Sequence, residues 1–454
     1  MSFFNNIFAL VKNHALIWAH AAISLVALVR IFYGALRKGQ GPLKARLAPE
    51  LRKNSTAIHI FTVLRAVLPN LVLSKVLVKS YENTGTAFVT RAEDVIEVLD
   101  READFAVVYG SRMRKLTDRE NFSNGENFFL GMQNSAEYQH DVSIMRLIMA
   151  REDVKTIIEP LARREAERLA AEHPDRIDLP PELTTRVPAA IVRDYFGVAA
   201  PEEDKLIAWS TVLFWWLFAE LAADPAVEAR AKDCAQKLCA CVDEAVARRK
   251  ASGEKKDDLL GRALALQASR PEFTDLAIRN NLVGIIIGAI PTLSKASVCA
   301  LDVLFSKPEA LSGARAAAQA GDDAALGAYI FEALRFNPIN PVIYRRANHD
   351  VTIAASTLRA RRIKKGTMVF AANLSAMFDP LKVDDPRAFR TDRPWGDYIL
   401  WGYGFHECFG AYINHAVLPV MLRPILAREN LRPAGEIDGG DTPPFPQHFT
   451  VVSD

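Results

Sequence analysis

The chain has 454 residues, of which 50% are hydrophobic, so it can bury a large core. Its formal net charge is +2, and it lacks a basic stripe with interleaved aromatic residues, which argues against a nucleic-acid partner. The five cysteines are an odd number, which argues against a disulfide framework and for a reducing compartment. No Gly/Ser/Pro-rich linker or internal repeat is found, so we expect one large domain, residues 41–454, after a distinct N-terminal segment, residues 1–40.

The N-terminal segment is apolar over residues 15–29 and has Arg30, Arg37 and Lys38 on its C-terminal side. A membrane-spanning helix needs about 20 apolar residues, so this run is short for a span. The basic flank nevertheless agrees with a retained anchor that leaves the catalytic domain in the cytoplasm. The alternative is an amphipathic helix or a helix that docks on the core. We therefore expect a protein on the cytoplasmic side, either soluble or membrane-associated through this segment.

The remainder of the chain is predicted to be mainly α with a minor β region. Residues 86–90 alternate like a strand, and residues 92–99 follow with a helical pattern. Helical periodicity then dominates over residues 136–319, and strand-like and irregular segments return after Pro338. Residues 213–218 are apolar all round a helix, which indicates core packing, membrane contact or the roof of an apolar pocket.

Two further features lie on predicted helices. A long helix starts at residues 274–275 and contains Pro291 and Thr292. Because proline has no backbone donor, Pro291 removes one intrahelical hydrogen bond and is expected to bend this helix. Further on, Glu332 and Arg335 lie on one helical face, where they can share hydrogen bonds, although such pairs are common on surface helices.

Residues 401–410, Trp-Gly-Tyr-Gly-Phe-His-Glu-Cys-Phe-Gly, place Cys408 in a glycine-rich loop directly before a helical pattern. Gly402 and Gly404 permit backbone conformations that other residues resist, and Gly410 allows a flat group to lie close to the chain. The amides at the start of the helix lower the pKa of a nearby thiol and favour the thiolate. Such a loop can hold a thiolate against a metal, whereas the alternative for Cys408 is ordinary burial in a turn.

The spacing aromatic-Gly-x-Gly-x-His-x-Cys-x-Gly resembles the axial-ligand loop of the cytochromes P450, the haem-thiolate monooxygenases. The resemblance covers residues 75–454 and implies the cytochrome P450 fold, with a single large catalytic domain and haem b (iron protoporphyrin IX) as cofactor. It implies that Cys408 is the iron ligand and that His406 lies against a haem propionate. Trp401 would replace the usual Phe beside the sulfur.

The same resemblance assigns roles to residues outside the loop. Glu332 and Arg335 would form a buried, hydrogen-bonded lock with Arg393 or its neighbours, and this lock would hold the thiolate loop. Arg345 would pair with a propionate through its planar guanidinium. His140 is a further propionate candidate, although the Arg that the family commonly places four residues after this His is absent.

The resemblance also exposes a departure at Pro291. In the family, a carboxylate and an adjacent hydroxyl relay protons for cleavage of the O–O bond. Thr292 aligns with the hydroxyl, but Pro291 aligns with the acid and has no ionisable group. Either a water or another side chain replaces the acid, or the chemistry differs.

Three functions remain open on this basis. The first is a monooxygenase that oxygenates an apolar, lipid or fatty-acid-like substrate with electrons from a separate ferredoxin or reductase, because the chain has no flavin or nicotinamide domain. The second is a peroxide-dependent peroxygenase or a lipid hydroperoxide isomerase, for which a proton relay is dispensable. Fatty-acid peroxygenases also have Pro at this position, but they pair it with an Arg where this chain has Ile290. The third is a non-catalytic haem-binding sensor. We favour the monooxygenase and rank the peroxide-dependent function only slightly lower.

Overall fold

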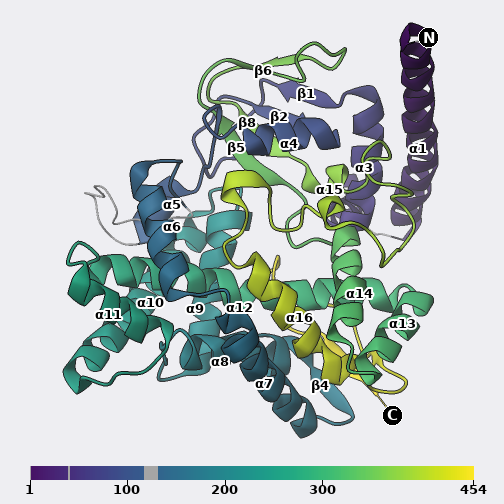
Figure 1. The fold of residues 1–454 in the computed structure, drawn as a ribbon. Coiled ribbons are helices and arrows are strands. Elements are labelled where there is room, and N and C mark those ends of the chain that lie inside the picture. The colour runs from purple at the N-terminus through teal and green to yellow at the C-terminus, as the bar shows by residue number, and fades with distance from the viewer. Residues whose placement is uncertain (1, 39–40, 117–130, 454) are drawn as a thin grey trace. The chain divides into compact units, whose positions relative to one another are not determined.

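The computed structural model describes residues 2–38, 41–116 and 131–453 of the chain (Figure 1). The chain forms two compact units. Unit 1 comprises Met1–Val78, Glu82–Ala106 and Glu332–Glu407, and unit 2 comprises Lys79–Tyr81, Val107–Phe331 and Cys408–Asp454. The expected boundary at residue 40 does not coincide with either unit, and the division into segment and domain stays a prediction.

Unit 1 is built round a five-stranded mixed sheet with the strand order β1-β2-β8-β5-β3. The elements of unit 1 are α1 (Ser2–Lys38), α2 (Leu43–Leu51), α3 (Asn54–Val67), β1 (Asn70–Leu73), β2 (Thr86–Val89), α4 (Ala92–Asp100), β3 (Phe105–Ala106), β5 (Ile343–Ala347), β6 (Val351–Ile353), β7 (Arg361–Ile363), β8 (Met368–Ala371) and α15 (Asn373–Ala376), with 3-10 turns at Trp395–Asp397 and Gly404–His406. The β2–β8 pair is parallel and joins strands from distant parts of the chain, seen as blue-purple and green ribbons in Figure 1.

The core of unit 1 lies between this sheet and α4. Val95 and Val98, one helical turn apart on α4, are fully buried with Val369 and Ala371 of β8. The start of α4 is fixed from far along the chain, because Asp379 accepts a hydrogen bond from the Ala92 amide at 3.0 Å. An acid at this end of a helix satisfies a backbone donor that the helix itself leaves without a partner.

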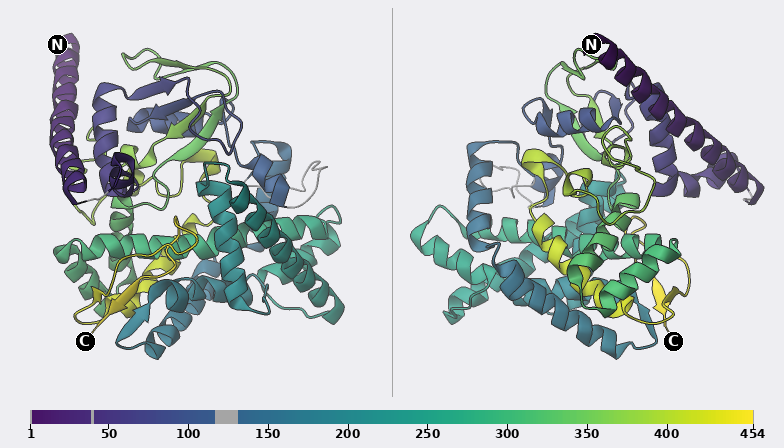
Figure 2. Two further views of the ribbon diagram at one scale, coloured as in Figure 1. Left: turned by 180° about the vertical axis from the view of Figure 1, so that it is seen from behind. Right: turned by 45° about the vertical axis from the view of Figure 1, so that its right-hand side comes forward.

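The N-terminal helix α1 packs on α3 through one side only (Figure 2). On that side Ala21, Ser24 and Leu28 are buried, and Arg387 donates a hydrogen bond to the Ser24 hydroxyl at 2.5 Å. The other side is apolar and exposed, and its exposed residues include Trp18, Ile23, Val26, Val29 and Tyr33. The helix is thus attached to unit 1 through a polar contact near its middle.

Unit 2 is mainly helical. Its elements are α5 (Gly110–Leu116), α6 (Ala136–Ile148), α7 (Glu159–Glu172), β4 (Arg176–Asp178), α8 (Arg186–Asp194), α9 (Glu203–Phe214), α10 (Pro225–Ser252), α11 (Leu259–Ser269), α12 (Asp275–Phe305), α13 (Pro308–Gln319), α14 (Asp323–Phe336, whose residues from 332 on belong to unit 1), α16 (Ala411–Leu426), β9 (Arg432–Pro433) and β10 (Thr450–Val452), with π-helical turns at Val154–Ile158, Pro180–Thr184 and Trp215–Ala219. The three strands form a small antiparallel sheet in the order β4-β10-β9.

The long helix α12 forms the centre of unit 2. The Thr274 hydroxyl caps it by accepting a hydrogen bond from the Ala277 amide at 3.2 Å, and α8, α9, α10 and α16 pack against it. Two helical stretches in the described residues are long and apolar enough to cross a membrane, Val11–Arg37 and Asp275–Phe305. The second is α12, which is 72% buried over its most apolar window and therefore has the burial of a core helix.

The apolar run at residues 213–218 ends α9 and enters the π-helical turn Trp215–Ala219. Trp216 and Leu217 are fully buried within unit 2. The Arg112 guanidinium lies 4.7 Å from the Trp216 ring centre and forms a buried ion pair with Glu220 at 2.7 Å. These two apolar side chains are therefore part of the core of unit 2.

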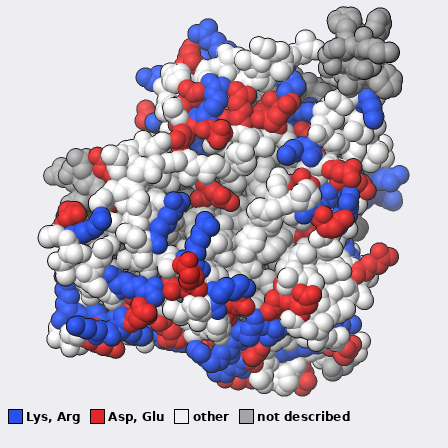
Figure 3. All heavy atoms as spheres, in the orientation of Figure 1, with Lys and Arg blue, Asp and Glu red and all other residues white. Residues whose placement is uncertain are grey.

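The predicted fold class, mainly α with a minor β region, is confirmed. On the face drawn in Figure 3, basic and acidic side chains are interspersed, as a net charge of +2 leads one to expect.

Candidate functional site

Residues 401–407 of the predicted thiolate loop belong to unit 1 and rest on the end of α4. Trp401 stacks on Trp395, with ring centres 5.5 Å apart and an interplanar angle of 24°. Gly402 and Gly404 have φ angles of +89° and +68°, a region that side chains other than glycine rarely adopt. A Cβ atom at Gly404 would also lie 3.3 Å from the Asp100 carboxylate, so the loop needs glycine there both for its conformation and for its close approach to α4.

Cys408 begins the part of the loop that belongs to unit 2 and leads into α16. The Ala411 amide donates to the Cys408 carbonyl at 3.1 Å, and Gly410 is the N-cap of the helix. All five cysteines of the chain are thiols, and Cys408 is exposed whereas the other four are buried. A Cβ atom at Gly410 would meet no heavy atom within 4 Å, so there is open space beside this end of the helix.

The Glu332 carboxylate is the centre of a buried hydrogen-bond network in unit 1. Arg335 donates to it twice, Nε to Oε2 at 2.9 Å and one terminal nitrogen to Oε1 at 2.7 Å. Arg393 Nε donates to Oε1 at 3.1 Å, and the Arg390 amide donates to the same oxygen at 3.0 Å. The Tyr398 hydroxyl completes the set at 3.2 Å from Oε2. Glu332 and Arg335 are both fully buried.

The two arginines of this network also bind backbone carbonyls of the segment before the thiolate loop. Arg335 donates to the carbonyls of Met377 at 3.0 Å and Pro386 at 2.9 Å. Arg393 donates to those of Asp384 at 2.6 Å and Ala388 at 2.8 Å. Each guanidinium is thus used on both the carboxylate and the backbone, which offsets the cost of burying its charge. The network holds the irregular segment 377–393 to the last turn of α14.

Arg345 and His406, the two predicted propionate partners in unit 1, lie close enough to interact electrostatically. The pKa of His406 is lowered to about 4, mainly because the ring is buried and to a smaller extent because the positive charge of Arg345 is nearby. Arg345 is 3% exposed on β5 and donates to the Tyr344 carbonyl at 3.0 Å. The two basic side chains therefore gather near the thiolate loop, where an anion would stabilise both.

The other candidates lie in unit 2. His140 is exposed on α6, and its propionate role stays a prediction. Pro291 and Thr292 lie within α12, which continues through the proline as one helix. The Thr292 hydroxyl donates to the carbonyl of Gly288. A Cβ atom at Gly288 would meet no heavy atom within 4 Å, so open space lies along the helix face that Gly288 shares with Thr292.

Sequence reasoning missed several residues of these sites. Tyr398 carries no motif, yet it binds Glu332, and burial together with that carboxylate raises its pKa. Arg151 lies 5.6 Å from the Tyr412 ring centre, in the first turn of α16. Lys295 lines a pocket with Pro291. The sequence did contain a sign that Lys295 is unusual, because it is the lone basic residue in the apolar part of α12 that follows Arg279.

The residues present fit a haem rather than a metal bound by protein alone. Among the described residues, no group of three or more His, Cys, Asp or Glu side chains could hold a metal ion. A porphyrin supplies four nitrogen ligands, so iron held in it needs few protein ligands, and a thiolate such as that of Cys408 is one of the usual ones. Within unit 1 the cationic Arg345 suits a propionate. Within unit 2 the open space at Gly410 suits a flat ring.

A family model for cytochrome P450 matches residues 75–438 of the chain. A C-19 steroid 1alpha-hydroxylase from Sorangium cellulosum is 25% identical over 60% of this chain and 65% of its own length. Cytochrome P450 144 from Mycobacterium tuberculosis is 25% identical over 57% of this chain and 56% of its own length. The chain thus spans less than two thirds of these two relatives. A mycinamicin IV hydroxylase/epoxidase from Micromonospora griseorubida is 23% identical over 75% of this chain and 81% of its own length.

The fold of this chain is also similar to those of solved cytochromes P450. A cytochrome P450 from Chondromyces apiculatus matches with a TM-score of 0.70 at 20% identity, over 89% of this chain and 96% of that one. P450BioI, solved with an acyl carrier protein ligated to hexadec-9Z-enoic acid, matches with a TM-score of 0.71 at 17% identity, over 88% and 99% of the two chains. The predicted cytochrome P450 fold is confirmed.

The Glu332 network generates a prediction about stability. Glu332→Gln leaves two buried guanidinium groups without their anion, and breaking a buried pair costs about 3–5 kcal/mol. We expect lower haem retention and a lower free energy of unfolding, measured by haem titration and urea unfolding. Arg390→Lys is the matched control, because among the described residues the Arg390 side chain pairs with the exposed Asp384 and Asp392, and its amide is kept. Full haem occupancy with lost turnover in Glu332→Gln would contradict a structural role.

Proposed function

The chain belongs to the cytochrome P450 family, and on that premise we propose that it is a monooxygenase that oxygenates an apolar, lipid- or fatty-acid-like substrate with electrons from a separate ferredoxin or reductase. Members of the family carry haem b, so the predicted cofactor is confirmed. The observation that carries the proposal is the exposed Cys408, which directly follows a segment of unit 1 shaped by two left-handed glycines.

The relatives support an oxygenation reaction. Two of those that match are a steroid hydroxylase and a hydroxylase/epoxidase, and a steroid C26-monooxygenase from Mycolicibacterium smegmatis is 24% identical over 58% of this chain. A lipid-like substrate is supported by the apolar residues of α12 and by the fatty-acyl group bound to P450BioI. The haem supplies the chemistry of dioxygen when bound, and a thiolate ligand favours O–O cleavage.

The protein's contribution to that chemistry is position and proton control. The backbone of residues 401–407 sets where the Cys408 sulfur can lie. The Thr292 hydroxyl has its proton on the Gly288 carbonyl, so it must rotate before it can donate elsewhere. Pro291 offers no proton, and the carbonyl of Ile287 loses its usual amide partner. A water bound at that carbonyl would supply the proton that the family takes from a carboxylate.

The lack of an ionisable group at Pro291 favours a second candidate, a peroxide-dependent peroxygenase or a lipid hydroperoxide isomerase. In these reactions the O–O bond is supplied by the substrate or co-substrate, so a proton relay is dispensable. Pro291 without an adjacent carboxylate is consistent with that chemistry.

A separate electron donor is supported by the charge near the cysteine. Arg146 and Arg151 are exposed, and both act on Tyr412, which lies in the first turn after the thiolate loop. Burial of Tyr412 raises its pKa to about 12, while the two arginines oppose that rise. An acidic redox protein would complement these cations.

We propose further that α1 attaches the protein to a membrane surface rather than spanning the bilayer. Its exposed side combines Trp18 and Val26 with the basic Arg30 and Arg37, a mixture suited to the interface of an anionic lipid layer. A span would carry the Ser24–Arg387 hydrogen bond at the middle of the helix into hydrocarbon together with the charged Arg387.

Thiolate ligation predicts a spectroscopic result. The ferrous carbonyl complex of the purified protein should show the red-shifted Soret band of a thiolate ligand, and Cys408→Ser should abolish that shift. Cys241→Ser is the control, because Cys241 is a buried cysteine of α10. A shifted band that persists in Cys408→Ser would identify another ligand.

The choice of oxidant can be tested at Pro291. If the missing acid limits dioxygen activation, Pro291→Asp should raise reductant-driven, oxygen-dependent turnover of an uncharged apolar substrate and change peroxide-driven turnover little, because a positioned acid is typically worth about 10²–10⁴-fold. Pro291→Ala restores the missing amide donor to the Ile287 carbonyl without adding an acid, and it serves as the control. Efficient coupling of reductant to product by the wild type, with no response to peroxide, would support the monooxygenase. Turnover with peroxide alone would support the second candidate.

Membrane attachment predicts that the full-length protein sediments with vesicles that contain phosphatidylglycerol. Val26→Glu combined with Val29→Glu should reduce this binding, because both side chains lie on the exposed side of α1 and leave its contact with α3 intact. Removal of residues 1–38 should abolish the binding and keep the haem spectrum. A full-length protein that is monomeric without detergent and stays in the supernatant would contradict the proposal.

A further inference from the structure

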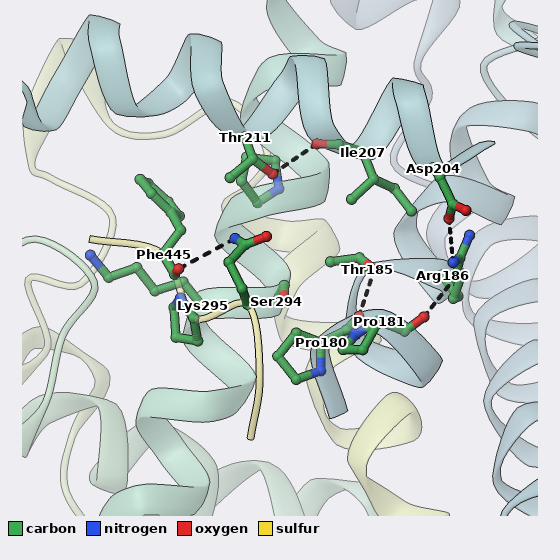
Figure 4. Close-up of a pocket in the computed structure, with 13 residues that line it drawn as sticks. Pro180, Pro181, Thr185, Arg186, Asp204, Ile207, Thr211, Ser294, Lys295 and Phe445 are labelled. Atoms are coloured by element: carbon green, nitrogen blue, oxygen red, sulfur yellow. Dashed lines mark hydrogen bonds and ion pairs between the residues drawn. The ribbon is translucent and has the colours of Figure 1, made fainter. Parts of the chain in front are cut away.

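A small pocket in unit 2 lies beside the proline of α12 (Figure 4). Its volume is about 100 Å³, which holds several waters but is well below the roughly 300–1,000 Å³ of pockets that enclose a whole drug-sized ligand. The pocket can therefore accommodate one end of a substrate. It is lined by Pro180, Pro181, Thr185, Arg186, Asp204, Ile207, Thr211, Pro291, Ser294, Lys295, Phe445, Pro446 and Gln447.

The polar groups of the lining are nearly all engaged within the protein. Arg186 pairs with Asp204 and, at 3.3 Å, with Glu203. Ser294 shares a hydrogen bond with Thr184 at 2.8 Å, and the Thr211 hydroxyl donates to the Ile207 carbonyl at 2.8 Å. Most polar groups of the pocket wall therefore have partners within the protein. One charged side chain of the wall has no carboxylate partner.

Lys295 is that side chain. It is partly buried and lies on α12 one turn after Pro291, and burial lowers its pKa. Its ammonium nitrogen is 4.9 Å from the ring centre of Phe445, and Figure 4 shows the side chain running beside that ring. Within the described ranges, no carboxylate is among the groups that shift the pKa of Lys295, and the only titratable group that does so is the Cys299 thiol. A lysine that is partly withdrawn from water is stabilised by an anion beside it, so this side chain offers a site for an anionic ligand.

The walls of the pocket restrict the kind of anion. Ile207, Phe445 and the prolines present aliphatic and aromatic surface next to a single cation. A phosphate carries about two charges and three strong acceptor oxygens, and it would need more donors than this wall offers. A carboxylate on an aliphatic chain has one charge, which matches Lys295, and methylene groups that match the apolar wall.

We propose that this pocket binds the carboxylate end of the substrate through Lys295, so that the substrate is an aliphatic or lipid-like carboxylic acid. The inference rests on the proposed function for the substrate's apolar character, but it adds the acidic end group and the residue that recognises it. Lys295 acts as a binding and specificity-determining residue. Because it is one turn from Pro291, the acid would anchor the substrate next to the position where the family's carboxylate is missing.

The test compares the binding of dodecanoic acid and dodecanol to the haem-loaded protein by isothermal titration calorimetry, which requires no turnover. Wild type should bind the acid about 10- to 100-fold more tightly than the alcohol, the ratio expected for one hydrogen bond to a charged group. Lys295→Gln should remove that preference by weakening acid binding and leaving alcohol binding unchanged, and Lys295→Arg should keep it. Lys205→Gln is the charge-matched control, because Lys205 lies on the exposed side of α9 and pairs with Glu202.

A second variant keeps the lysine and fills its site. Pro291→Asp places a carboxylate four residues before Lys295, the spacing at which the two pair on a helix, and it should also abolish the preference for the acid. Equal binding of acid and alcohol by wild type, or an unchanged preference in Lys295→Gln or Pro291→Asp, would overturn the inference. A protein that prefers the acid but oxygenates nothing would contradict the proposed function instead. A protein that hydroxylates substrates yet binds the acid and the alcohol equally would overturn the inference about Lys295 and leave the proposed function intact.

Discussion

The rest of unit 1 depends on one buried carboxylate and the cations that neutralise it. Glu332 accepts hydrogen bonds from two arginines, one tyrosine and one backbone amide, and the arginines extend the same network to backbone carbonyls up to Ala388. Charges are expensive to remove from water, so such a network is stable only when each member has its partners. A segment with little regular structure is thereby given a defined path into the thiolate loop.

The same constraint explains why Lys295 stands out. Two buried arginines elsewhere in the described structure are each paired with a carboxylate, Arg112 with Glu220 at 2.7 Å and Arg91 with Asp379 at 3.1 Å. Lys295 has an aromatic ring and a small pocket instead of an anion. A cation that borders a cavity and has no carboxylate partner is suited to binding an anion there.

Pro291 connects the two parts of the functional argument. In the proposed function it leaves the proton relay without its acid, and it also forms part of the wall of the pocket that Lys295 lines. A carboxylate at this position would pair with Lys295 one turn later and occupy the anion site from within. Under the proposal, an acid at position 291 and a bound carboxylate would therefore compete for the same lysine.

The sequence by itself determined the family, the fold class and the cofactor, because these follow from two local patterns. The spacing of the thiolate loop is imposed by glycine conformations, and that of Glu332 and Arg335 by helical periodicity. It also located α12 and its unusual proline. Only the tertiary structure decided which groups surround Glu332, since Tyr398 and the Arg390 amide reach it across more than fifty residues with no motif. The tertiary structure likewise brought Phe445 to Lys295 and Arg387 to Ser24. Such contacts depend on how distant segments pack, and neither periodicity nor spacing carries that information.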